Sequence, residues 1–167
     1  MKNQTYFTEY SSPLGVITLA ATDAGLCGLY FEAHKHPPME KASWVKDDGP
    51  RFDDAREWLR RYFAGEKSRH TPNLISESGT AFQQRVWTEL KKISAGKTAT
   101  YSQIADAIGS PNAVRAVGAA IGRNPLSIFV PCHRVVGSNG SLTGYAGGVE
   151  RKRWLLSHES ANGAPAH

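Results

Sequence analysis

The chain has 167 residues and a mass of 18.2 kDa, with 40% hydrophobic, 21% charged and 10% aromatic residues. This is the composition of a globular protein, and it excludes a disordered chain, a collagen-like repeat and a coiled coil. The formal net charge is +5, but residues 1–79 hold ten Lys/Arg and eleven Asp/Glu (−1), whereas residues 80–159 hold ten Lys/Arg and four Asp/Glu (+6). The basic half indicates an anionic partner for that part of the chain; a basic surface kept for solubility is the alternative.

The sequence predicts neither a membrane span nor a targeting segment. It has no run of about 18 apolar residues, and Met1–Thr5 leads into no apolar stretch of the kind that follows the start of a signal peptide. The two cysteines, Cys27 and Cys132, cannot form a disulfide framework and suit a reducing compartment. We therefore expect a cytoplasmic protein without membrane contact.

The first half predicts a small α+β unit. Three β-rich runs lie at 6–10, 16–21 and 26–31, and the turn residues Asp23-Ala24-Gly25 make the last two a hairpin. Residues 34–50 form a polar connection, after which apolar side chains recur at helical spacing over 52–63.

The second half predicts short helices beyond an aperiodic, polar stretch at 68–79. Thr80 and Thr100 each begin a capping box, the first opening a helix that runs to Gly96 and the second a helix that ends at Gly109. Ser110-Pro111 has the pattern of an N-cap followed by proline, and predicts a further helix that ends at Gly122.

The last two of these helices, joined by a tight turn, predict a helix-turn-helix. Such a pair binds nucleic acid in some proteins and is purely structural in others. The second helix has small residues on its expected outer face and one internal cation, Arg115. Such a surface can approach a narrow groove closely, although close helix–helix packing is the alternative. The small residues are Ala113, Ala116, Gly118, Ala119 and Ala120.

The segment Pro131-Cys132-His133-Arg134 carries the strongest chemical signal. It follows the apolar run 126–131, which predicts a strand. A lone cysteine is often a small buried hydrophobe, and Cys27 fits that description. Cys132 has a base and a cation beside it, as a nucleophilic thiolate requires, and Glu159 is the candidate carboxylate to orient His133. Adjacent residues of an extended chain point apart, so the backbone must bend at Cys132 or a water must bridge the two side chains.

Here the sequence resembles the O6-alkylguanine-DNA alkyltransferase family, in its bacterial stand-alone form. The segments that carry the resemblance span 80–159: Arg115-Ala-Val-Gly118, Asn124-Pro125, Pro131-Cys-His-Arg-Val135, Gly144-Tyr-Ala-Gly-Gly148 and Trp154-Leu-Leu-Ser-His-Glu159. Ser12-Pro-Leu-Gly15 matches more loosely. The resemblance implies an α+β fold: a small N-terminal antiparallel sheet with a helix, ribonuclease H-like, and then a mostly helical, winged-helix-like domain. We expect a support domain at 1–76, a DNA-binding and alkyl-transfer domain at 77–161 and a disordered tail at 162–167.

The resemblance also implies a role for each matching residue. Cys132 would accept the alkyl group, His133 would deprotonate it through water, Glu159 would orient His133, and Asn124 would brace the turn that carries the site. Tyr101 would promote nucleotide rotation and donate a hydrogen bond to the flipped guanine. Arg115 would fill the gap left in the base stack. Further DNA contacts are expected at Ser110, Ala113, Val114 and Ser138, and the expected substrate pocket comprises Ser127, Val135, Tyr145, Ala146 and Gly147.

The expected activity is single-turnover repair of double-stranded DNA that contains O6-alkylguanine or O4-alkylthymine. Extrusion of a base is required for chemistry on it, and a poorly paired base costs less to extrude. Because the product is a thioether, which offers water no activated centre, we expect no turnover. The chemistry needs no cofactor, and we expect a monomer without an obligatory protein partner. Scattered Cys27, His34, His36 and His70 do not have the spacing of a structural zinc site, so we expect no metal.

Two other functions would fit part of the pattern. One is a sensor or regulator that binds alkylated DNA without reacting, and the presence of Cys132 weighs against it. The other is a thiol hydrolase using Cys132, His133 and Glu159, which would leave the helix-turn-helix and Arg115 without a purpose. The remaining basic run, Arg151-Lys152-Arg153, is expected on a solvated helix face, and contact with DNA phosphate is the alternative.

Overall fold

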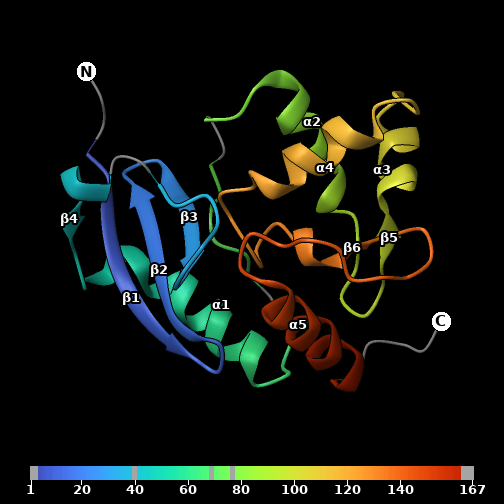
Figure 1. Ribbon diagram of the computed structural model, residues 1–167. Coiled ribbons are helices and arrows are strands. Elements are labelled where there is room, and N and C mark those ends of the chain that lie inside the picture. The colour runs from blue at the N-terminus through green and yellow to red at the C-terminus, as the bar shows by residue number, and fades with distance from the viewer. Residues whose placement is uncertain (1–3, 39–40, 68–69, 76–77, 163–167) are drawn as a thin grey trace.

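The structure, a computed structural model, describes residues 4–38, 41–67, 70–75 and 78–162 (Figure 1). A sheet with one helix forms one side of the molecule, and a group of short helices forms the other. The α+β class expected from the sequence is confirmed. The expected domain boundary at 76/77, and residues 163–167 of the expected tail, lie outside the described residues.

The sheet has the strand order β3-β2-β1-β4. Strands β1 (Tyr6–Ser12), β2 (Gly15–Thr22) and β3 (Gly25–Phe31) pair antiparallel, as the sequence predicts. Strand β4 (Val45–Lys46) lies within the stretch predicted as a polar connection and pairs parallel with β1. A two-residue, exposed strand has no periodicity to detect.

Helix α1 (Asp53–Phe63) lies against the sheet and follows a 3-10 turn at Pro50–Phe52. Its buried face carries Ala55 and Leu59. Gly65 adopts φ +78°, the left-handed conformation that ends a helix at low cost for glycine. This helix occupies the place that the sequence pattern predicts.

The capping boxes at Thr80 and Thr100 open α2 (Ala81–Leu90) and α3 (Tyr101–Ala107). In both, the threonine hydroxyl accepts from the N3 backbone N–H while the N3 glutamine accepts from the threonine N–H. The predicted continuation of α2 to Gly96 is wrong. After Leu90 the N–H groups of Lys92 and Ile93 donate to carbonyls three residues back, so the α-helical hydrogen-bond pattern ends there.

The predicted start of the next helix at Ser110-Pro111 is also wrong. Residues 110–113 form a turn closed by Ala113 N–H and Ser110 C=O, and α4 (Val114–Gly122) begins only after it, without a side-chain cap. The serine–proline pair therefore shapes the turn of the helix-turn-helix and not the first turn of the helix.

The apolar run 126–131 is not the strand that its composition predicts. Leu126 makes an isolated bridge to Leu29 of β3, and the chain then folds into successive turns in which Ile128 adopts φ +71°. Leu29 N–H donates to Pro125 C=O. Burial from all sides explains the apolar composition.

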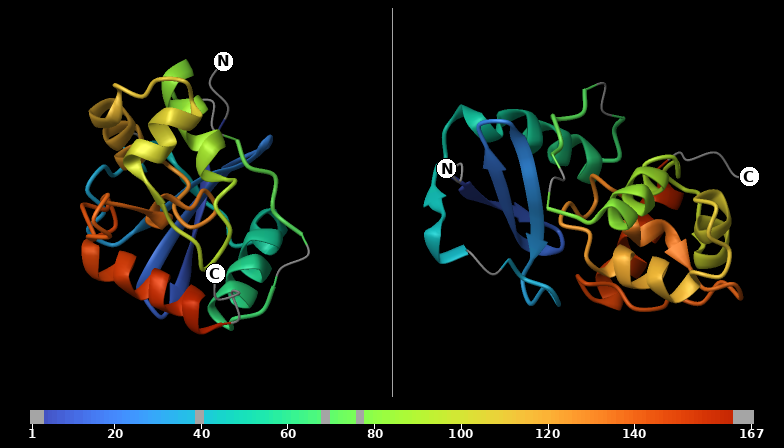
Figure 2. Two further views of the ribbon diagram at one scale, coloured as in Figure 1. Left: turned by 90° about the vertical axis from the view of Figure 1, so that its right-hand side faces the viewer. Right: turned by 90° about the horizontal axis from the view of Figure 1, so that it is seen from above.

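Helix α5 (Val149–Ala161) is the last element and contacts the 3-10 turn Cys132–Arg134, after which the short strand β6 (Val135–Val136) pairs parallel with β5 (Ala99–Thr100). Figure 2 shows the sheet and the helical group side by side. One continuous hydrophobic cluster joins them, and Trp58 of α1 packs on Phe129 at 4.6 Å between ring centroids.

Within the described residues, no helix combines the length and apolarity needed to cross a membrane.

The capping box at Thr100 fixes the start of α3 and so places Tyr101 at the first helical position. Loss of the Thr100 hydroxyl should destabilise the fold. We expect Thr100→Ala to lower the free energy of unfolding by about 1 kcal/mol, because one helix N–H loses its acceptor. Urea unfolding followed by circular dichroism measures this. Thr98→Ala, at an exposed position just before the box, should change the free energy by less than about 0.5 kcal/mol; equal effects of the two variants would contradict the prediction.

Candidate active site

Cys132 lies in a 3-10 turn, Cys132–Arg134, immediately after Pro131. The turn supplies the bend that an extended chain lacks. Cys132 is 3% exposed and His133 is fully buried. The structure thus brings thiol and imidazole into the same buried region.

Asn124 holds the segment that leads into this turn. Its side-chain amide donates to Val130 C=O at 2.8 Å, and its Oδ1 accepts from Leu126 N–H at 3.0 Å. The side chain is buried, so both bonds are shielded from water. Asn124 therefore closes the loop 124–130 in the bracing position that the family resemblance implies.

His133 and Glu159 are in direct contact. His133 Nε2 lies 2.7 Å from Glu159 Oε2, and both side chains are at most 2% exposed. Arg134 binds the Glu159 carboxylate through two hydrogen bonds, with Nε donating to Oε1 at 2.8 Å and Nη2 donating to Oε2 at 2.9 Å. An ionised carboxylate only accepts, so Nε2 carries the imidazole proton. His133 Nδ1 is left as a buried lone pair with no hydrogen-bond partner among the described residues.

The electrostatics keep the thiol and the imidazole neutral at rest. Burial raises the pKa of Cys132, against smaller opposing effects of Asn124, Lys152 and Ser127. Burial lowers the pKa of His133, and Glu159 opposes that shift. Cys132 therefore needs a base to become a nucleophile, and a neutral imidazole can act as one.

Glu159 itself stays ionised. Burial favours its neutral form, but hydrogen bonds from His133 and Arg134 outweigh burial and hold its pKa well below the usual range. A buried carboxylate with this many donors is fixed in both charge and position.

Two of the expected pocket residues, Ser127 and Tyr145, interact with the thiol of Cys132. Ser127 and Tyr145 are buried, and each has a hydroxyl with no hydrogen-bond partner among the described residues. Both hydroxyls lie near enough to Cys132 to act on its ionisation or to be acted on by it. Val135 and Ala146 are also buried. Unsatisfied polar atoms gathered around a buried thiol are typical of a site built for a ligand.

The N-terminal half supports one wall of this pocket. Lys35 N–H donates to Ala146 C=O at 2.7 Å, and Arg151 donates to the carbonyls of Leu14, Glu32 and Gly147. A Cβ at Gly147 would lie 2.5 Å from the Phe31 ring. Packing against the sheet therefore requires this glycine, in addition to the expected approach of a base.

The residues expected at DNA lie on the helical half. Tyr101 begins α3 and is half-buried, and its hydroxyl is 2.7 Å from Thr143 Oγ1. Arg115 and Val114 are exposed on the first turn of α4, and Ser110 and Ala113 are the two ends of the turn before it. Ser138 is exposed in a separate turn between β6 and α5.

Two expectations about exposed surfaces are wrong. Ala120, assigned to the outer face of α4, is 2% exposed because α4 packs on α2 there, where Trp87 Nε1 donates to the Ala120 carbonyl. Lys152, assigned to a solvated face, is 1% exposed, donates to Thr143 C=O and lies 6.0 Å from the Tyr101 ring centroid.

Helical spacing could have revealed Lys152, since it shares a face of α5 with Leu155 and Glu159, three and seven residues later. Tyr62 lies on the helical apolar spacing over 52–63, but that spacing gives no sign of its partner. Its hydroxyl donates to Glu159 Oε2 at 2.6 Å from 97 residues away. Only the packing of α1 against α5 brings these two residues together.

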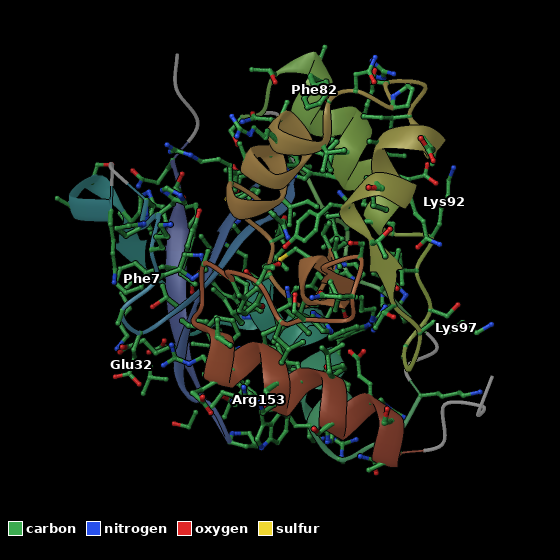
Figure 3. The ribbon with its side chains drawn as sticks, turned by 45° about the vertical axis from the view of Figure 1, so that its right-hand side comes forward. Phe7, Glu32, Phe82, Lys92, Lys97 and Arg153 are labelled. Atoms are coloured by element: carbon green, nitrogen blue, oxygen red, sulfur yellow. The ribbon has the colours of Figure 1, made fainter. Side chains whose placement is uncertain are left out.

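Charged side chains away from the site are mostly paired or exposed. Figure 3 shows Lys92 and Lys97 extending from the helical half, with Glu32 at the opposite edge.

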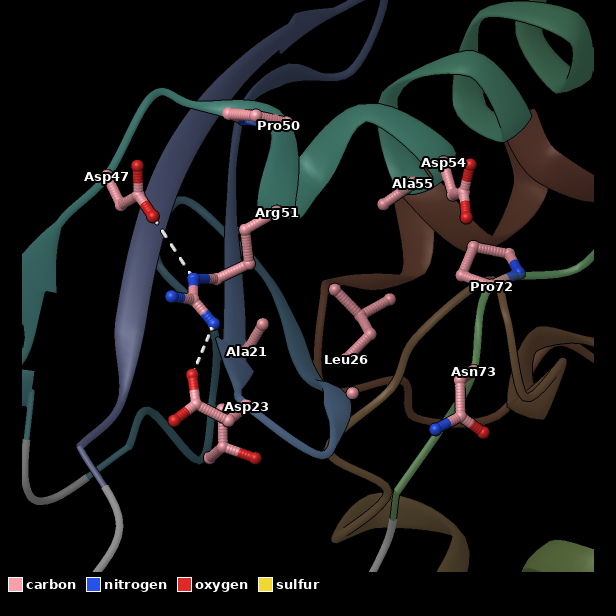
Figure 4. Close-up of a pocket in the computed structure, with 12 residues that line it drawn as sticks. Ala21, Asp23, Leu26, Asp47, Pro50, Arg51, Asp54, Ala55, Pro72 and Asn73 are labelled. Atoms are coloured by element: carbon pink, nitrogen blue, oxygen red, sulfur yellow. Dashed lines mark hydrogen bonds and ion pairs between the residues drawn. The ribbon is translucent and has the colours of Figure 1, made fainter.

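A cavity of about 510 Å³ lies between β2, β3, α1 and residues 72–73 (Figure 4). Its Arg51 bridges Asp23 and Asp47, and none of the expected site residues lines it. Among the described residues, no group of three or more His, Cys, Asp or Glu could hold a metal ion.

Comparison with known proteins identifies two family models along the chain. Residues 5–74 match the ribonuclease-like domain of 6-O-methylguanine DNA methyltransferase, and residues 81–161 match its DNA binding domain. The methylated-DNA–protein-cysteine methyltransferase of Methanosarcina acetivorans is 46% identical over 156 residues, which cover 93% of this chain and 99% of that protein.

Solved structures agree with this. A crystal structure of the O6-methylguanine methyltransferase of Mycobacterium tuberculosis has a TM-score of 0.87 and 44% identity, and the match covers 98% of this chain and 97% of that one. A crystal structure of OGT from the same organism in complex with DNA has a TM-score of 0.86 and 44% identity, covering 96% of each chain.

The depressed pKa of Glu159 predicts a pH-dependent stability. The ionised carboxylate stabilises the fold above the ordinary carboxyl pKa, about 4.3, and this contribution is lost as the pH falls from there toward the lower folded-state pKa. We expect Glu159→Gln to lower the free energy of unfolding by about 3 kcal/mol near neutral pH, because it breaks a buried ion pair. The deficit should shrink at acidic pH.

Urea unfolding of both proteins from neutral pH down to the most acidic pH at which they fold tests this. Glu150→Gln, at an exposed position on the same helix, is the control and should show little deficit at any pH. A Glu159→Gln deficit that stayed constant with pH would show that the charge of Glu159 does not stabilise the fold.

Proposed function

This chain belongs to the 6-O-methylguanine DNA methyltransferase family, and from that premise we propose that it repairs DNA by moving an alkyl group from O6 of guanine to Cys132. The observation that carries the proposal is the buried His133–Glu159 pair, whose histidine shares a 3-10 turn with the buried Cys132. It supplies a nucleophile, a base with a bare Nδ1 and a carboxylate that fixes the tautomer. The relatives' names, methylated-DNA–protein-cysteine methyltransferase, describe the same transfer.

The reaction we propose is a displacement at saturated carbon. The Cys132 proton passes to His133 Nδ1 through a bridging water, and the imidazolium that forms is stabilised by Glu159. The sulfur then forms a bond to the alkyl carbon as the bond from that carbon to guanine O6 breaks. The electron pair of the broken bond stays on the purine, which takes up a proton as it returns to guanine.

Two side chains near the thiol would stabilise charge during transfer. Lys152 places a buried ammonium where it favours the thiolate of Cys132. Tyr101 would donate its hydroxyl proton to the purine as negative charge develops there, while still accepting from Thr143. The pocket walls, Val135, Tyr145, Ala146 and Gly147 with Ser127, would hold the extruded base against the sulfur.

DNA is the partner that the charge distribution favours, since the basic half of the chain carries the helix-turn-helix. The relative from Mycobacterium tuberculosis has been crystallised with DNA. In our proposal α4 enters the minor groove, Arg115 takes the place of the flipped nucleotide, and Ser110, Ala113, Val114 and Ser138 lie against the backbone. The residues up to 76 then serve as a support for the transfer domain at 77–161.

The product is a stable thioether, so one protein molecule would repair one lesion without a cofactor, and O4-alkylthymine would be a second substrate. We propose that the protein acts as a monomer in the cytoplasm, where reduced thiols persist.

Transfer to Cys132 has a direct test in intact-protein mass. Incubation with a duplex that holds one O6-methylguanine should add one methyl mass to Cys132 and saturate at one equivalent. Cys132→Ala should gain no mass and keep its affinity for the lesion, whereas Cys27→Ser should react as the wild type does. Tight lesion binding without a mass gain would instead indicate a sensor, and repeated turnover of an ester or amide would indicate a thiol hydrolase.

Arg115 should matter for duplex substrates alone. We expect Arg115→Ala to slow methyl transfer from duplex DNA by about tenfold or more, because extrusion of a base costs a few kcal/mol. Reaction with free O6-benzylguanine base, which needs no extrusion, should stay within about twofold of wild type. Arg153→Ala, exposed on α5, should leave both rates unchanged; equal losses on both substrates with Arg115→Ala would place Arg115 in the chemistry or the fold.

A further inference from the structure

The N-terminal half reaches the reacting groups through one phenol. Tyr62 of α1 donates to Glu159 Oε2 at 2.6 Å. Its ring stacks on Trp58 at 5.3 Å with 7° between the planes, and Phe63 meets it edge-on at 5.3 Å. Its backbone carbonyl lies 2.7 Å from His158 Nε2 on α5. The hydroxyl therefore has a defined position that does not depend on its bond to Glu159.

The hydroxyl competes with His133 for the same oxygen. Glu159 Oε2 accepts from His133, Arg134 and Tyr62, whereas Oε1 accepts from Arg134. A donor on Oε2 stabilises the carboxylate charge and weakens the pull of that charge on the imidazole proton. A carboxylate without this donor would hold a protonated His133 more strongly.

Other charged groups near His133 and Glu159 also change the pKa of His133. Arg134 from the 3-10 turn and Lys152 from α5 oppose protonation of His133. Tyr145, from the loop before α5, interacts with Cys132 and Glu159, and His158 contacts the backbone carbonyl of Tyr62. Among these groups, Tyr62 is the donor to Oε2 that comes from outside the C-terminal half.

We propose that Tyr62 is a positioning residue for alkyl transfer, and that its hydroxyl lowers the basicity of His133 through Glu159 and so sets the acidic limit of the reaction. The inference rests on the proposed function, in which His133 is the base. It gives the N-terminal half a part in the chemistry besides support: helix α1 determines the pH below which His133 becomes protonated and Cys132 keeps its proton.

Removal of the hydroxyl tests the inference with the shape of the ring retained. In Tyr62→Phe, the acidic limb of the single-turnover rate of methyl transfer from duplex O6-methylguanine should move to higher pH. We expect a loss of about threefold or more on the acidic limb of the wild-type profile and a rate within about twofold of wild type on its plateau, because the rate falls about tenfold for each pH unit below the pKa of the base. Tyr10→Phe is the matched control, because its ring also packs on α1, against Phe63. Its pH profile should coincide with that of the wild type.

A second measurement does not need activity. Titration of the His133 ring by NMR should give a higher pKa in Tyr62→Phe than in the wild type and no change in Tyr10→Phe. An unchanged His133 pKa, or a rate loss that is the same at every pH, would overturn the inference and leave Tyr62 a structural role. A wild type that transfers no methyl group while Tyr62→Phe still raises the His133 pKa would refute the proposed function and leave the coupling through Glu159 intact.

Discussion

The buried carboxylate of Glu159 is the point on which the site depends. An isolated charge in this position would be too costly to keep, and the surrounding donors offset that cost. His133 and Arg134 come from the turn that also holds Cys132, and Tyr62 comes from the other half of the chain. One charge thus fixes the imidazole tautomer, anchors the cysteine turn and ties α1 to α5.

The need to hold donors from both halves of the chain on Glu159 explains why the two halves share one core. A carboxylate that accepts from both halves keeps its geometry only if they do not move apart, and the contact between Trp58 and Phe129 packs them tightly. Arg151 also links the two halves, since it donates to the carbonyls of Leu14 and Glu32 in the N-terminal half and of Gly147 in the C-terminal half. The pocket wall at 145–147 is therefore built on the sheet, although its residues belong to the C-terminal half.

Burial also sets how the nucleophile is used. A permanently ionised thiolate would be open to oxidation and to adventitious electrophiles. Here burial favours the neutral forms of Cys132 and His133, so in the proposed reaction the nucleophile forms only when a proton can pass to Nδ1. For a protein that we propose to react once, a resting state of low reactivity preserves the acceptor until a lesion occupies the pocket.

The sequence by itself determined the parts whose causes are local. The β2–β3 hairpin, the capping boxes at Thr80 and Thr100 and the adjacent Cys132 and His133 follow from short-range pattern and chemistry, whereas Glu159 could be named from the sequence only as a candidate partner. The structure alone decided what depends on packing. The run at 126–131 is apolar because it is buried, and not because it is a strand; Lys152 is buried because α5 turns it toward the thiol. Tyr62 bonds Glu159 from 97 residues away, and a contact between distant segments exists only once the core has brought them together.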